Sequence, residues 1–269
     1  MHIEKIDLEI TRRCTLECEH CLRGEIQDIN IGDETLKNIF ENIKTIDTLL
    51  ITGGEPLIAV NELEKIVQLI GLNKIKIGQI RLITNGTILS SRVLKILKEL
   101  SKISNLDLKI SFDIFHKIEL EKRNLKDKRD NNVKVLKEIF GAKEYGEEDK
   151  YQRENIKYEY QGLQPIGRAK NLNFERLKEI NSLVFIKYTV FPFVTWFRDC
   201  AYFEGDKLCG TISIDVNGNI VERGLSFEEE DRFSKQFETN INELSFVDAI
   251  NNYINVEQSK SVDGMARKK

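Results

Sequence analysis

Three cysteines, Cys14, Cys18 and Cys21, lie close together in the stretch TRRCTLECEHC, just after a segment that alternates apolar and polar residues. The spacing CxxxCxxC lets a single loop bring three thiolates to one metal centre. Structural zinc usually takes four protein ligands, often from two separated CxxC pairs. Three thiolates suit an iron–sulfur cluster with one iron left open for a further ligand. The pattern indicates a metal site, and either Cys200 or Cys209 could instead complete a zinc site.

The composition is that of an ordinary globular protein. The chain has 269 residues, of which 41% are hydrophobic and 32% are charged, and this favours one large α/β domain. The 41 basic and 44 acidic residues give a net charge of -3, so we expect neither nucleic acid nor a membrane as partner. We find no secretory signal and no apolar stretch of membrane-spanning length. The odd number of clustered cysteines argues against a disulfide framework and favours the cytoplasm.

Strands and amphipathic helices alternate along the first half of the chain. The expected strands are 6–10, 46–52, 76–84, 106–112 and 156–160. The expected helices are 33–44, 61–71, 90–100 and a charged surface segment at 117–140, with a loop at 144–154. For the second helix, Asn61 and Glu64 resemble a capping box, and Gly71 marks its end. Such alternation specifies parallel βαβ units, because each crossover helix covers the sheet that its strands form.

The polar residues of the strands indicate an open, polar concave face. In three strands the apolar residues must pack under the helices, which leaves the other face polar. That face would carry Asp7, Glu9, Asp107, Lys109, Ser111, Asp113, Lys157, Glu159 and Gln161. A closed barrel fills its interior with branched apolar side chains, so this face should be wet or occupied. The alternative is an antiparallel sheet with one solvent face.

The pattern changes beyond Lys170. A short helix is expected at 174–180, an apolar strand at 183–191, and a hairpin at 211–221 that turns about Asn217 and Gly218.

Several motifs occur in an order that resembles the radical S-adenosylmethionine (radical SAM) superfamily. The CxxxCxxC loop follows the first strand, with His20 just before its third cysteine, and GGEP at 53–56 follows the second strand. TNG at 84–86, SFD at 111–113 and PIGRA at 165–169 follow later strands. Each lies at the carboxyl end of an expected strand, where the active sites of such barrels lie.

The resemblance implies a role for each matching residue. The implied ligands of a single 4Fe-4S cluster are Cys14, Cys18 and Cys21, and the residues implied to contact S-adenosylmethionine are His20, Gly53, Gly54, Glu55, Pro56, Asn85, Ser111, Asp113, Gly167 and Arg168. Gly53, Gly54 and Glu55 would meet the methionyl ammonium. Glu55 could instead be an ordinary acid at a helix start, and the other polar residues could be turn or cap groups.

Other side chains carry weaker expectations. His116 could line the cofactor or cap a helix. Lys109, Lys157 and Glu159 are expected to face the substrate.

The implied fold is α/β, a partial (β/α)6 barrel at 1–190 with a small α+β extension at 191–269. The extension resembles a degenerate auxiliary-cluster module, in which Arg223 stands where a cysteine is usual. Two thiols, Cys200 and Cys209, cannot supply the four ligands of a fully protein-bound 4Fe-4S cluster, so we expect no second cluster.

The implied reaction is reductive cleavage of S-adenosylmethionine to a 5′-deoxyadenosyl radical, which abstracts hydrogen from a peptide or small molecule. A flavodoxin or ferredoxin would supply the electron. The alternative is a non-catalytic iron–sulfur or zinc protein with a structural, sensing or electron-transfer role.

Overall fold

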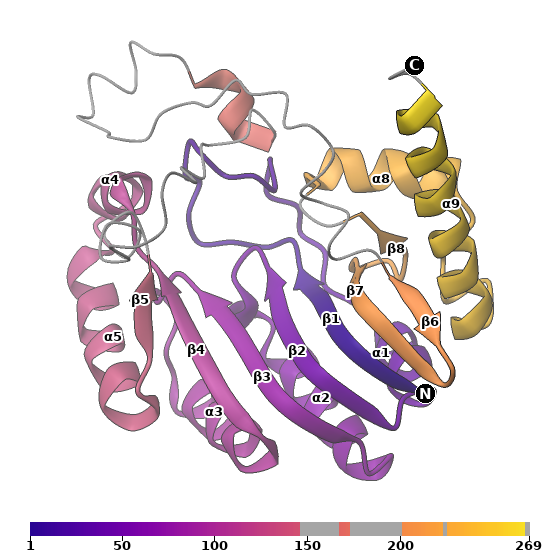
Figure 1. The fold of residues 1–269 in the computed structure, drawn as a ribbon. Helices are drawn as coiled ribbons and strands as arrows, with labels where there is room; N and C mark the ends of the chain where they lie inside the picture. The colour runs from indigo at the N-terminus through magenta and orange to yellow at the C-terminus, as the bar shows by residue number, and fades with distance from the viewer. Residues whose placement is uncertain (146–166, 173–200, 223–224, 267–269) are drawn as a thin grey trace, which may run out of the picture.

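The computed structural model describes residues 1–145, 167–172, 201–222 and 225–266 (Figure 1). Its strands are β1 (His2–Thr11), β2 (Thr45–Gly53), β3 (Lys76–Thr84), β4 (Asn105–Ser111), β5 (Lys143–Tyr145), β6 (Tyr202–Glu204), β7 (Lys207–Ile214) and β8 (Ile220–Val221). Its α-helices are α1 (Asp33–Phe40), α2 (Val60–Leu72), α3 (Ser91–Ile103), α4 (Ile114–Lys122), α5 (Lys126–Phe140), α8 (Phe227–Gln236) and α9 (Phe246–Ala266). Two 3-10 turns, η1 (Pro56–Ile58) and η2 (Gly167–Asn171), complete the described elements.

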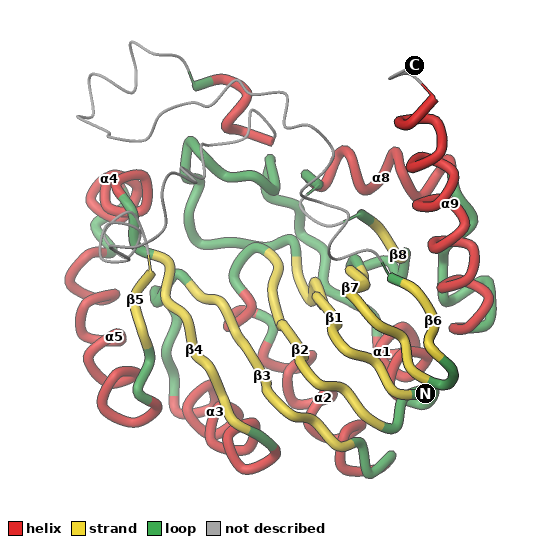
Figure 2. The backbone as a smooth tube through the Cα atoms, in the orientation of Figure 1, coloured by secondary structure: helices red, strands yellow, loops and turns green. Residues whose placement is uncertain are grey.

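The strands form one curved sheet in the order β5-β4-β3-β2-β1-β7-β6, with β8 paired to β7. Strands β1 to β4 pair in parallel, as predicted. Strand β5, which comes earlier in the chain than the fifth strand predicted at 156–160, pairs in parallel with β4, and β7 adds to the other edge in parallel with β1. Helices α1, α2 and α3 cover one face of this sheet (Figure 2). The α/β fold with the open, parallel sheet of a partial barrel is therefore confirmed, and the antiparallel alternative is wrong.

The core lies between the sheet and these helices. Ile6, Leu8 and Ile10 of β1 are fully buried, and so are Leu36 and Ile39 of α1. Burying an aliphatic side chain of this size contributes about 1.5–3 kcal/mol. The helices and the sheet are therefore held together mainly by the apolar faces that they bury against each other.

Some boundaries differ from the predicted ones. The segment at 144–154 was expected to be a loop, but its first two residues belong to β5, which begins at Lys143 opposite Lys109 of β4. The charged segment at 117–140 forms two helices, because the chain turns at Asn124, whose φ is 54°. The strands expected at 156–160 and 183–191, the helix at 174–180, Cys200, Arg223 and the boundary at 190 lie outside the described residues.

The capping box predicted for α2 is wrong. The helix begins at Val60, one residue early, and its N-cap residue Ala59 makes no side-chain hydrogen bond. Asn61 and Glu64 instead accept hydrogen bonds from Arg92 of α3. The two side chains therefore connect α2 to α3 and do not cap α2. Gly71 is the last residue of the helix but one, so the helix ends at Leu72, one residue beyond the predicted end.

The hairpin predicted about Asn217 and Gly218 is confirmed, since β7 and β8 pair antiparallel around it. On the polar face of β1, Asp7 and Glu9 are buried, and Glu9 pairs with Arg12. Charged side chains therefore occupy this part of the concave face. Among the described residues, no helix has the length and apolar character needed to cross a membrane.

Candidate cofactor site

The cysteine loop begins where β1 ends and is anchored on the end of β2. The backbone N–H of Gly54 donates to the carbonyl of Thr11, and that of Glu55 donates to the carbonyl of Arg13, both over 2.8 Å. A Cβ atom at Gly53 or Gly54 would lie 2.2 Å from the carbonyl oxygen of Thr11 or Arg13, respectively. The two glycines are therefore required because two backbones meet here without room for a side chain.

The three cysteines share one small, partly enclosed space. All three thiols are free, Cys18 is buried, and the N–H of Cys21 donates to the carbonyl of Cys18 over 3.1 Å. Burial raises the pKa of the Cys14 thiol to about 12, and the nearby charges of Glu55 and Cys21 add to this. Burial and the charge of Cys14 likewise raise the pKa of Cys18. Bound as thiolates, these groups would need a cation to offset their charge.

Asn85 brings the end of β3 to the first cysteine. Its side-chain amide donates to the hydroxyl of Thr15 over 3.0 Å and lies 3.7 Å from the sulfur of Cys14. Its Oδ1 accepts from the N–H and the hydroxyl of Thr87, which fixes the orientation of the amide. The hydroxyls of Thr15 and Thr87 lie 2.6 Å apart, so the loop is tied to the strand end by two side chains.

Glu55 connects the ends of β2 and β3. Its carboxylate is fully buried and accepts from the hydroxyl of Thr84 and the N–H of Asn85, both over 2.7 Å, and from the N–H of Leu57 over 3.0 Å. Burial raises the pKa of Glu55 in spite of these three donors. A carboxylate has about four acceptor positions. Donors within the protein use three of those of Glu55.

At the end of β4, Asp113 holds two histidines. Its carboxylate lies 3.0 Å from Nε2 of His20 and 2.8 Å from Nδ1 of His116, and it also caps α4 by accepting from the N–H of His116. These hydrogen bonds outweigh burial and lower the pKa of Asp113. The ring of His20 stacks on Phe115, with centroids 4.5 Å apart and planes 12° apart. The ligand atoms of this trio lie within 4.8 Å of one another, so the histidines and Asp113 also have metal-ligand chemistry.

The turn η2 covers the cysteine loop. The N–H of Arg168 donates to the carbonyl of Cys21, and its Nε donates to the carbonyl of Cys18, each over 3.0 Å. Gly167 has a φ of 59°, and a Cβ there would lie 2.3 Å from the carbonyl of Leu22. Only glycine permits this approach, which brings a segment distant in sequence against the loop.

The described residues fit the iron–sulfur cluster and cofactor that the motifs imply. Three free thiols provide the donor set, and burial raises the pKa of two of them, Cys14 and Cys18. Beside them, Nδ1 of His20 is buried without a hydrogen-bond partner among the described residues, as expected of a group that awaits a ligand.

Ser111 lies half-buried at the end of β4, at the same edge of the sheet as GGEP, Asn85 and Asp113. Pro56 begins η1. Lys157 and Glu159 lie outside the described residues.

Sequence reasoning missed Arg12, Arg23 and Phe227, which contact the base of the loop. The doubled arginine at 12–13 was the only available signal, and it does not distinguish a buried arginine from an exposed one.

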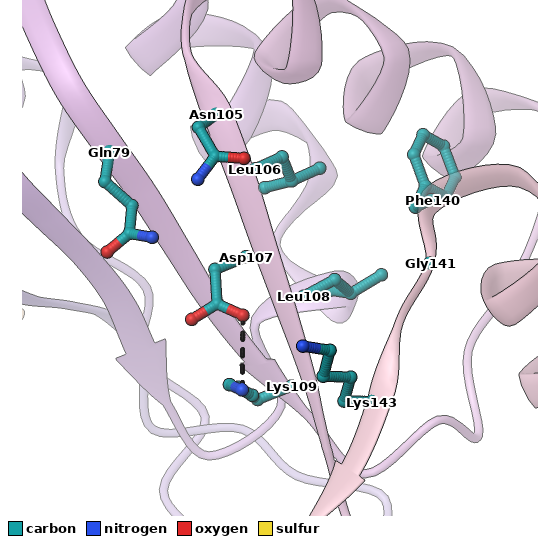
Figure 3. A pocket seen from close by; sticks show the side chains of 9 residues that line it. All are labelled: Gln79, Asn105, Leu106, Asp107, Leu108, Lys109, Phe140, Gly141 and Lys143. Carbon is teal, nitrogen blue, oxygen red and sulfur yellow. Dashed lines mark ion pairs between the residues drawn. The ribbon is translucent and has the colours of Figure 1, made fainter.

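A hollow of about 400 Å³ lies beside β4, between that strand and the start of β5 (Figure 3). Lys109 lines it together with Asp107, and their side chains pair over 3.3 Å. Arg81 of β3 also binds Asp107, over 2.8 Å. The part of the concave face that was predicted to be polar and accessible is therefore lined by charged, partly exposed groups.

Comparison with known proteins gives relatives that cover most of this chain. The uncharacterized protein MJ0907 of Methanocaldococcus jannaschii is 27% identical over 189 residues, which are 68% of this chain and 57% of that protein. A GTP 3′,8-cyclase of Clostridium perfringens is 28% identical over 208 residues, 68% of this chain and 62% of the cyclase. The chain thus spans about three fifths of the length of these curated relatives.

Two solved structures are similar in fold. One is native anSMEcpe with bound AdoMet and Cp18Cys peptide, with a TM-score of 0.41 and 19% identity over 54% of this chain and 42% of that chain. The other is Streptococcus suis SuiB bound to precursor peptide SuiA, with a TM-score of 0.40 and 14% identity over 82% of this chain and 59% of that chain.

The family model of the radical SAM superfamily matches residues 8–143, which are half of the chain. That range contains the three cysteines, GGEP, Asn85 and Asp113, all of which the fold brings to one edge of the sheet. Membership implies a 4Fe-4S cluster and S-adenosylmethionine. The chain therefore belongs to the radical SAM superfamily of enzymes.

Proposed function

We propose that this protein binds one 4Fe-4S cluster through Cys14, Cys18 and Cys21 and uses it, with S-adenosylmethionine, to abstract hydrogen from a polar substrate. The observation that carries the proposal is the placement of three free thiols in one loop, which residues at the ends of β2, β3 and β4 contact. When bound, the cluster and S-adenosylmethionine supply reductive cleavage to a 5′-deoxyadenosyl radical.

The surrounding residues orient the cofactor and exclude water. We assign the methionyl ammonium to the partly exposed backbone of Gly53 and Gly54, with Glu55 as the buried group that fixes this strand end. His20 presents its unpartnered Nδ1, and Asp113 fixes the plane of its ring. Asn85 and Ser111 remain candidates for the ribose and carboxylate, while Arg168 together with Gly167 holds the loop closed and lines the adenine side.

The substrate is assigned to the charged concave face. Lys109 and Asp107 are partly exposed there, with Arg81 beside them. Such a lining favours a substrate with anionic or hydrogen-bonding groups, because an apolar substrate would remove water from these partly exposed charged groups without replacing its hydrogen bonds. A peptide and a small molecule both satisfy this requirement. The relative from Clostridium perfringens, by its name, acts on GTP, which makes GTP the first small molecule to test.

The remaining assignments follow from the chemistry of the cluster. A flavodoxin or ferredoxin is the proposed electron donor. Thiolate ligands require a reducing compartment, so we propose the cytoplasm. We also propose a core at 1–190 and an extension at 191–269 that carries no second cluster.

The reaction is tested first without substrate. The protein is reconstituted anaerobically, reduced with dithionite and incubated with S-adenosylmethionine, and 5′-deoxyadenosine is measured by chromatography. We expect it to form with wild type and to fall to background in Cys18→Ala. If an intact cluster yields none, the protein is a non-catalytic iron–sulfur protein, and if zinc binds in place of iron it is a zinc protein.

The substrate is then sought by isotope transfer. Reconstituted protein is incubated with GTP alone, and separately with peptide and small-molecule fractions of a fully deuterated cell extract. Deuterium in 5′-deoxyadenosine identifies the fraction that donates hydrogen. Lys109→Ala should lower label transfer while leaving the substrate-free cleavage rate unchanged, and equal transfer in both proteins would exclude a contact at Lys109.

A further inference from the structure

Two arginines flank the cysteine motif symmetrically. Arg12 precedes Cys14 by two residues, and Arg23 follows Cys21 by two. Arg12 is almost completely buried, with 1% of its surface exposed, although a buried arginine is costly unless its charge is paired. The loop therefore has one cation at each end of its base.

Two carboxylates join these cations into a ring of alternating charges. One oxygen of Glu230 lies 3.2 Å from Arg12 and the other lies 2.7 Å from Arg23. Glu9 also pairs with both arginines: one of its oxygens lies 2.9 Å from Nε of Arg12, and the other pairs with the guanidinium of Arg23. Both carboxylates and Arg12 are buried and Arg23 is partly exposed, so most of the ring is shielded from water.

A single aromatic ring contacts both cations. The guanidinium of Arg12 lies 4.8 Å from the centroid of Phe227, and that of Arg23 lies 4.6 Å from it. Phe227 also donates its N–H to the carbonyl of Arg23 over 2.9 Å, and the Arg23 side chain donates to the carbonyl of Leu225. Phe227 and Glu230 both belong to α8, whose N-terminus is fixed by a Ser226–Glu229 capping box.

We propose that Arg12, Arg23, Glu9, Glu230 and Phe227 form a loop clasp, in which α8 positions the cysteine loop so that its three thiols meet at one cluster. Phe227 and Glu230 are positioning residues, because they act on the thiols through the two arginines. This proposal rests on the proposed function in one respect: it takes the 4Fe-4S cluster to be the group that the cysteine loop binds.

The loop clasp fixes the position of the cysteine loop more than it adds to the free energy of unfolding. Buried ion pairs gain little net free energy, because their attraction is largely offset by desolvation, yet they define one arrangement. A cation–π contact is attractive and becomes stronger when its groups are out of water, and Phe227 makes two of them. The loss of both should therefore weaken the hold on the loop by about tenfold while the apolar packing of α8 is kept.

The test compares two equivalent substitutions in α8. Phe227→Leu removes the aromatic face under the arginines, whereas Phe233→Leu changes an equally buried ring that contacts Phe237 and Tyr253 instead. Both full-length proteins are reconstituted anaerobically. Iron release to a chelator is followed by absorbance, and amide hydrogen exchange by mass spectrometry, with the thermal midpoint measured alongside.

We expect Phe227→Leu to release iron about tenfold faster than Phe233→Leu and to speed exchange of the amides at 12–24, with similar thermal midpoints in both variants. Glu230→Gln, which keeps the shape but removes one bridging charge, should shift both readouts in the same direction. Equal release and equal exchange at 12–24 in the two phenylalanine variants would overturn the clasp. The exchange readout needs neither cofactor cleavage nor substrate, so it separates failure of the clasp from failure of the proposed function.

Discussion

Arg168 binds the backbones of two cysteines while leaving their thiols free. Its N–H donates to the carbonyl of Cys21 and its Nε to that of Cys18, each over 3.0 Å. Because carbonyls and not sulfurs are the acceptors, the same contacts can persist whether or not the thiols bind metal. The loop is thus held by η2 above and by the loop clasp at its base.

Arg168→Ala should accelerate loss of iron from the reconstituted protein by roughly tenfold. A hydrogen bond from a charged donor contributes about 1.5–3 kcal/mol, and the backbone bond to Cys21 remains in this variant. The measurement is the rate of iron transfer to a chelator under anaerobic conditions. Lys170→Ala is the control, since Lys170 belongs to the same turn but is exposed and contacts Glu228. Equal rates for the two variants would show that the Nε contact does not hold the loop.

Gly54→Ala should prevent assembly of the site and lower stability. The new methyl group would lie 2.2 Å from the carbonyl oxygen of Arg13, a distance that forces two backbones apart. We expect a loss of at least about 2 kcal/mol in the free energy of unfolding and little bound iron after reconstitution. Urea denaturation and iron analysis measure these effects.

Gly71→Ala provides the opposite control. This glycine is inside α2, and a Cβ there meets nothing within 4 Å. We expect a gain of about 0.5–1 kcal/mol, because alanine is the better helix former. If both substitutions had the same effect, the close approach at Gly54 would not be a constraint.

The strands and helices that carry the motifs could be predicted from the sequence, because local hydrophobic periodicity identifies each element and the motifs directly follow the strands. The strand predicted at 76–84 coincides with β3, and the polar side chains after each strand meet at one edge as parallel topology requires. Contacts between distant segments were not predictable. The role of Arg12 depends on Glu230, and that of Asn61 on Arg92, and no local pattern reports such partners.

Asp113→Asn should destabilise the protein near neutral pH and lose this effect in acid. Hydrogen bonds from His116 and His20 hold the pKa of Asp113 below its ordinary value of 3.8. The folded state therefore binds the proton more weakly than the unfolded chain does, so the carboxylate adds stability above about pH 4, and this is lost as pH falls further. The test compares urea midpoints of the iron-free, reduced proteins at about pH 5 and about pH 2, which lie on either side of the unfolded pKa and both below the range in which histidines ordinarily titrate. A difference between wild type and variant that is equal at both values would contradict the prediction.

Glu230→Gln should become relatively more stable as pH rises. Burial raises the pKa of Glu230 from 4.5 to about 7, and although Arg23 opposes this, the charge of Asp215 adds to it. Because the folded pKa lies above the unfolded one, the folded state binds the proton more tightly, and the free energy of unfolding falls between about pH 4.5 and pH 7 as the carboxyl ionises. Glutamine has no proton to lose, so the variant lacks this fall.

The measurement is the difference in urea midpoint between Glu230→Gln and wild type, taken at pH 5 and again at pH 7.5 on iron-free, reduced protein. We expect this difference to shift in favour of the variant at the higher pH. Glu228→Gln is the matched control on α8, because Glu228 is exposed and Arg232 lowers its pKa, so its difference should not shift toward the variant. A shift of the same sign and size in both variants would show that burial does not raise the pKa of Glu230.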